Sequence, residues 1–160
     1  MNWNLISLLL RNLFFTILQP GIVVGLVPYW ILKNAAIDFP SHWTLLHCIG
    51  LIVFIPGLFI MLKCILQFAF EGKGTLSPAD PTKHLVVKGL YKYSRNPMYI
   101  GVLLILLGEW IFFQLHAMLI YTFLIFILFN LFILFVEEPR LKKDFKNDYE
   151  VYCKKVRRWI

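Results

Sequence analysis

Long apolar segments alternate with short polar ones along the chain, and this alternation predicts a bundle of membrane-spanning helices. The apolar segments cover about residues 5–32, 43–70, 97–113 and 117–136. A helix needs about 20 residues to cross the roughly 30 Å hydrocarbon core of a bilayer. We therefore expect an all-α, polytopic membrane protein with about four transmembrane helices.

A cleaved secretory signal peptide is the alternative for the first apolar segment. It is disfavoured because Arg11 lies inside the apolar run instead of before it, and no small-residue cleavage site follows. The segment is interrupted by Gln19-Pro20-Gly21, which predicts a kinked spanning helix.

The C-terminal tail, residues 140–160, has a different pattern, and a helix is expected over residues 140–158. Apolar residues recur at spacings of three and four, the period of one helix face: Leu141, Phe145, Tyr149, Tyr152, Val156 and Trp159. From residue 140 to the end, eight Lys or Arg stand against three acidic residues, which leaves +5. This predicts a basic amphipathic helix in the headgroup layer, with an ordinary solvated tail as the alternative.

The amino-acid composition supports the prediction of a membrane protein. The 160 residues are 59% hydrophobic and 16% charged, with a mean hydropathy of +0.71, whereas soluble domains are about 25% charged. The length suits one integral membrane domain over residues 1–160. Cys48, Cys64 and Cys153 are scattered without CxxC spacing, so we expect neither a disulfide framework nor a metal site.

Basic residues concentrate in the connection after the second segment and in the tail, while the other two turns are neutral or lack Lys and Arg. The positive-inside rule then predicts four crossings with both termini in the cytoplasm.

Two polar groups of residues are expected at that cytoplasmic face. Arg95 and Asn96 precede Pro97, which suits the first turn of a helix, and the hairpin of the last two spans returns Glu137 and Glu138 to the same side. Adjacent carboxylates at a membrane boundary are costly unless a cation or hydrogen-bond donor meets them. Either a ligand with ammonium and hydroxyl groups meets them, or an ion pair with Arg95 fastens the helix ends.

Glu109 lies well inside the third apolar segment, which makes it a functional candidate by depth alone. It is also roughly 18 Å from Pro97 along a helix. A structural partner on a neighbouring helix is therefore an equal expectation.

The stretch from Lys88 to Gly101, KGLYKYSRNPMYIG, and the later Glu137-Glu138-Pro139-Arg140-Leu141 carry a resemblance. Together with Phe145, Tyr149, Tyr152 and the closing Val156-Arg157-Arg158-Trp159, they are similar to the isoprenylcysteine carboxyl methyltransferase family and its phospholipid methyltransferase relatives. The similarity covers roughly the C-terminal half of the chain.

This resemblance implies an integral membrane enzyme that takes S-adenosyl-L-methionine on the cytoplasmic side and methylates a lipophilic acceptor. By position it assigns cofactor binding to Arg95, Asn96, Pro97, Tyr99, Glu137 and Glu138, with Arg95 and Glu138 as the catalytic candidates. Leu85, Val86 and Tyr91, in the same polar stretch, are counted as further candidate cofactor-binding residues.

The chain departs from the family pattern at two positions. Asn96 stands where many members have His, and Lys146 stands where Gly commonly follows the Phe of the tail.

The acceptor is expected to be a carboxylate, such as that of isoprenylcysteine, or a lipid amine. Membrane lipids and a lipophilic or lipidated substrate are the expected partners, and no nucleic acid. Two alternatives remain at this stage: an NADPH-dependent membrane reductase of the sterol-reductase type, and a non-enzymatic membrane scaffold with a basic lipid-binding tail.

Overall fold

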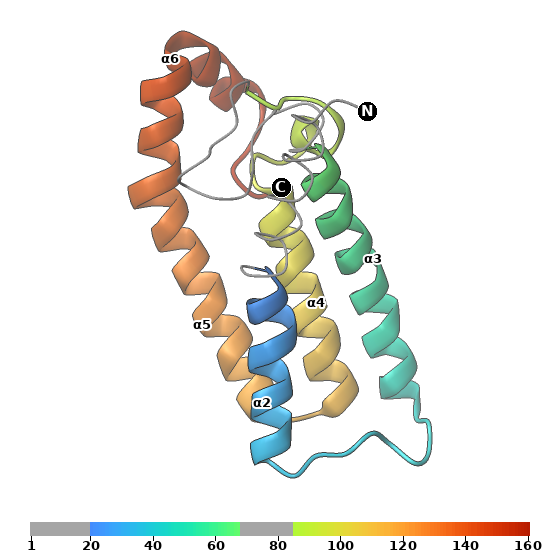
Figure 1. The fold of residues 1–160 in the computed structure, drawn as a ribbon. Helices are drawn as coiled ribbons and strands as arrows, with labels where there is room; N and C mark the ends of the chain where they lie inside the picture. The colour runs from blue at the N-terminus through green and yellow to red at the C-terminus, as the bar shows by residue number, and fades with distance from the viewer. Residues whose placement is uncertain (1–19, 68–84) are drawn as a thin grey trace, which may run out of the picture.

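The computed structural model describes residues 20–67 and 85–160, and every regular element in these two ranges is helical. In Figure 1, α4 lies between α3 and α5, α2 lies in front of them, and α6 follows α5 and turns across one end. The helices are α2 (Val27–Asn34), α3 (Leu45–Gln67), α4 (Pro97–Phe113), α5 (His116–Phe132) and α6 (Glu138–Lys155), with short turns η1 (Ile22–Leu26), η3 (Gly89–Lys92) and η4 (Ile133–Glu137). The all-α prediction is confirmed, while most of the first predicted segment lies outside the described residues.

Two helical stretches in the described ranges are long and apolar enough to cross a membrane. These are α3, with 23 residues, and the continuous helix His116–Lys155, with 40. Large apolar side chains on them are exposed, among them Ile52 (68%), Phe59 (65%) and Phe123 (60%). Such surfaces mark contact with lipid or with another protein, which is consistent with a polytopic membrane protein.

Helices α3 and α4 pack closely because glycines face each other at two levels. A Cβ atom on Gly50 would lie 2.8 Å from the carbonyl oxygen of Gly108, and one on Gly57 would lie 2.8 Å from that of Gly101. The glycines are seven residues apart on each helix, so both pairs lie along one face. Small residues of this kind allow membrane helices to approach closely, and α4 is thereby fixed against α3.

Two π-helical turns each end two residues before a proline. The turn η1 precedes Pro28, and η4 precedes Pro139. A proline inside a helix lacks the N–H that would bond four residues back, and its ring collides with that carbonyl. A wider π turn at that point lets the helix continue, so α5 runs through Glu137 and Glu138 into α6 without a break.

Helix α6 bends at Lys146, where φ is 44° and ψ is −120°. After this bend the helix turns back across the end of the bundle (Figure 1). Its buried residues Tyr149 and Tyr152 form an apolar cluster with Val156, against which Leu85 and Phe145 pack. The helix ends at Lys155, and the chain is extended at Val156.

Candidate functional site

A compact loop precedes the N-terminus of α4. The amide of Asn96 donates to the hydroxyl of Ser94 at 3.1 Å, and Pro97 follows in the first turn of α4. The hydroxyl of Tyr152 on α6 donates to the carbonyl of Tyr91 at 2.6 Å. Burial raises the pKa of Tyr91, so its phenol stays protonated.

Glu138 at the start of α6 is held by two guanidinium groups. Arg158 donates from Nε to Oε1 at 2.9 Å and from Nη2 to Oε2 at 3.0 Å. Nη1 of Arg95 lies 3.3 Å from Oε1. Hydrogen bonding to Glu138 raises the pKa of Arg158. The ion pair expected between Arg95 and the glutamates is therefore present, and it involves Glu138.

The same Nη1 of Arg95 also faces the second half of α6. It lies 2.7 Å from Sγ of Cys153 and 3.4 Å from the hydroxyl of Tyr149. The Nε atom of Arg95 is buried and has no hydrogen-bond partner among the described residues. A buried N–H without a partner is costly, and the Nε atom of Arg140 is in the same situation.

Glu137 has a different environment from its neighbour. Its Oε2 accepts a hydrogen bond of 2.8 Å from the hydroxyl of Tyr99, whose ring lies 4.5 Å from the ring of Phe129. Within residues 20–67 and 85–160 no ion pair of Glu137 is present. The glutamate pair thus divides into one carboxylate paired with two arginines and one that accepts a hydrogen bond from a phenol, with the charge of Arg140 nearby.

The last residues of the chain are fastened to the loop before α4. The amide of Arg95 donates to the carbonyl of Arg157 at 3.0 Å. The carbonyl of Arg158 accepts from Nδ2 of Asn96 at 3.0 Å and from the hydroxyl of Ser94 at 3.3 Å. The side-chain amide of Asn96 is therefore hydrogen-bonded to the C-terminal segment.

Trp159 also joins the C-terminal segment to α5. Its Nε1 donates to Oδ1 of Asn130 at 3.2 Å, and its ring lies 5.6 Å from that of Phe126. The C-terminal segment therefore spans from the loop before α4 to α5 and covers the end of the bundle that holds the glutamates.

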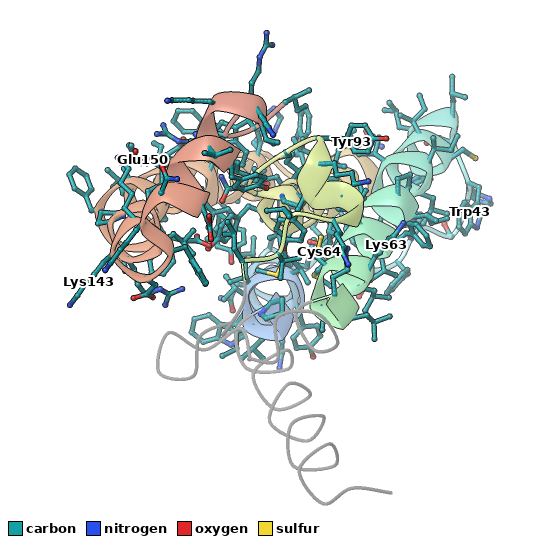
Figure 2. The ribbon with its side chains drawn as sticks, turned by 90° about the horizontal axis from the view of Figure 1, so that it is seen from above. Trp43, Lys63, Cys64, Tyr93, Lys143 and Glu150 are labelled. Atoms are coloured by element: carbon teal, nitrogen blue, oxygen red, sulfur yellow. The ribbon has the colours of Figure 1, made fainter. Side chains whose placement is uncertain are left out.

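The remaining sequence candidates form the walls of this region. Val86 and Tyr91 are buried in a cluster with Cys64 of α3, and Leu85 packs against the tyrosines of α6. Seen along the bundle in Figure 2, Cys64 lies near the middle while Tyr93 points outward. The structure brings the polar candidates together, and it adds Ser94, Arg158, Tyr149 and Cys153, whose contacts were not foreseen.

The signal for Arg158 was present in the sequence. It belongs to the closing Val156-Arg157-Arg158-Trp159 of the resemblance, but neither its spacing nor its type tells which carboxylate it meets.

A comparison with protein-family models decides the family. The phospholipid methyltransferase model matches residues 45–148, which is more than half of the chain. The chain belongs to the phospholipid methyltransferase family. Isoprenylcysteine carboxyl methyltransferases belong to the same family, so the resemblance predicted from the sequence is confirmed. No curated protein and no solved structure shows a significant match.

The match includes α3 and α4, which carry the glycine contact, and also Arg95, Tyr99 and both glutamates. Membership of the phospholipid methyltransferase family implies methyl transfer to lipid-like substrates at a membrane. Arg158 and Trp159 lie beyond the matched residues.

Proposed function

We propose that the chain transfers a methyl group from S-adenosyl-L-methionine to a lipophilic acceptor at the end of the bundle covered by α6. The observation that carries this proposal is that Arg95 pairs with Glu138, and Tyr99 donates to Glu137, at the end of the bundle where the C-terminal segment lies. The acceptor is a carboxylate, such as that of isoprenylcysteine, or a lipid amine.

The donors and acceptors at this end suit the polar groups of S-adenosyl-L-methionine, which are an ammonium, a carboxylate and ribose hydroxyls. Glu137 has one phenol as its partner and suits the ammonium or the hydroxyls. The buried Nε of Arg95 lacks a partner and suits a carboxylate.

Glu138 acts through Arg95 in this proposal. Two guanidinium groups already occupy its oxygens, so it fixes the orientation of Arg95 instead of contacting the methyl donor. Arg158 holds Glu138 from the other side and is a positioning residue.

Methyl transfer from a sulfonium is an in-line displacement: the acceptor lone pair forms the new bond to the methyl carbon as the carbon–sulfur bond breaks, leaving a neutral thioether. Such a step depends on alignment and on exclusion of water more than on a strong base. In this chain Arg95 and Glu137 orient the bound groups, and Trp159 with the C-terminal segment shields them. In this proposal the lipid acceptor enters sideways from the membrane, between the helices.

The topology belongs to this proposal as well. Residues 1–160 form one domain with four crossings, and both termini lie in the cytoplasm with the site. The concentration of basic residues on α6 supports this topology, because cytoplasmic segments of membrane proteins carry an excess of Lys and Arg.

The test measures transfer of a radiolabelled methyl group from S-adenosyl-L-methionine into extracted lipids and prenylated cysteine analogues by membranes containing the protein. Wild type should label one of these acceptors. Glu137→Gln should reduce labelling about tenfold or more, because a hydrogen bond to a charged group is worth about 1.5–3 kcal/mol. Glu150→Gln, at an exposed position on α6 (Figure 2), is the matched control.

Equal labelling by wild type and Glu137→Gln would overturn the assignment of Glu137. Oxidation of NADPH by the same membranes, without methyl transfer, would replace the proposal with a reductase.

A further inference from the structure

A second polar group is buried at the opposite end of the bundle. Glu109 lies four residues before the end of α4, and its Oε2 is buried without a hydrogen-bond partner among the described residues. The partner on a neighbouring helix that the sequence left open is thus absent within residues 20–67 and 85–160. A buried carboxylate oxygen without a partner is strongly unfavourable, so a ligand that supplies a cation or donor would be stabilised here.

Glu109 lines a cavity of about 230 Å³. The other lining residues are apolar or glycine: Phe39, Gly50, Leu51, Phe54, Gly108, Phe112 and Phe113. Gly50 and Gly108 are one of the two facing glycine pairs of α3 and α4. The cavity therefore lies beside a rigid helix contact, at the end away from α6.

Aromatic rings form much of the cavity wall. The ring of Phe39, in the connection between α2 and α3, lies 5.7 Å from that of Phe113 and 6.4 Å from that of Phe112, both edge to face. Aromatic rings together with a carboxylate favour an organic cation, because the ring faces attract ammonium groups and the carboxylate neutralises the charge. An anionic ligand would be repelled by the carboxylate, and a ligand without a cation or a hydrogen-bond donor would leave its buried oxygen without a partner.

We propose that this cavity binds the ammonium headgroup of a membrane lipid. The lipid comes from the leaflet at the end of the bundle opposite α6. At 1.5 Å per residue, Glu109 is roughly 6 Å from the end of α4, which is within the reach of a headgroup. Phe39 is 82% exposed, so this side of the wall is accessible from outside the bundle. This site is separate from the proposed methyl-transfer site, since Pro97 and Glu109 are at opposite ends of α4.

The test is native mass spectrometry of the purified protein in maltoside detergent, titrated with dimyristoyl phosphatidylethanolamine. Dimyristoyl phosphatidylglycerol has the same chains without an amine and serves as the comparison lipid. We expect tighter binding of the ethanolamine lipid to wild type, and a loss of about tenfold in Glu109→Gln. Phe39→Ala, which keeps the charge, should weaken binding about threefold by removing one ring.

One further variant is the control. Glu150→Gln controls for the loss of any acidic residue and should bind the lipid as wild type does. Equal affinity of Glu109→Gln and wild type, or no preference of wild type for the ethanolamine lipid, would overturn the proposal. Competition by free ethanolamine at similar concentration would overturn the lipid as the source of the ammonium group. Phe39→Ala keeps the test decisive if Glu109→Gln does not fold.

Discussion

The bend in α6 predicts that Lys146→Gly stabilises the protein. Lys146 has φ 44° and ψ −120°, a conformation that costs a residue with a Cβ about 1–3 kcal/mol and that glycine adopts freely. Against this, glycine loses more conformational entropy on folding than lysine does, which costs about 0.5–1 kcal/mol. The balance is a gain of roughly 0–2.5 kcal/mol with a middle value near 1 kcal/mol, which corresponds to a rise in Tm of about 2–4 °C at that middle value for a chain of this size.

Lys143 provides the control, because it is exposed within the regular part of α6 and is also a lysine (Figure 2). At a helical position glycine costs about 1 kcal/mol, so Lys143→Gly should lower the Tm by about 2–4 °C. Both variants are measured by thermal unfolding of the detergent-solubilised protein, followed by circular dichroism at 222 nm (a helix signal). A fall in Tm for both variants would refute the reasoning, since the opposite signs depend only on the backbone conformation at Lys146.

Three other substitutions test the packing and the site. Gly57→Leu should lower the Tm by an amount equivalent to about 1–3 kcal/mol, because its Cβ meets backbone atoms at 2.8 Å, whereas Gly25→Leu, with nothing within 4 Å, should not. Arg158→Ala should weaken binding of S-adenosylhomocysteine about 5- to 30-fold by calorimetry, since two charge-assisted hydrogen bonds are lost at a partly exposed site. Arg157→Ala keeps the backbone carbonyl that accepts from the amide of Arg95, so this variant should bind S-adenosylhomocysteine as wild type does. Tyr99→Phe should weaken the same binding about three- to tenfold, and unchanged affinity would exclude the phenol from the site.

The placement of Arg95 and the glutamate pair at the same end of the bundle could be predicted from local pattern. Two apolar segments joined by a turn as short as Gln114 and Leu115 must return antiparallel, which brings Glu138 back to the end where α4 begins. Lys146 was also signalled, because a lysine at a position where relatives commonly have glycine leaves the local backbone in question. The positive φ at Lys146 is a backbone conformation that glycine adopts freely.

The role of Arg158 could not be predicted, for a physical reason. It reaches Glu138 through an extended segment that follows a bend, and such contacts depend on tertiary packing instead of periodicity. The glycine pairs are similar: the seven-residue spacing of Gly50 and Gly57 is visible in the sequence, but nothing local shows that α4 carries the matching pair. Which glutamate remains available to a ligand follows only from the placement of Arg158.

Calorimetric titration of the detergent-solubilised protein with S-adenosylhomocysteine tests the central claim most directly. It compares wild type with Arg95→Ala and Glu138→Gln, and Arg157→Ala serves as the control. We predict binding to wild type and the control, and at least a tenfold loss in the other two variants. No binding to folded wild-type protein, or equal binding by all four proteins, would contradict the account.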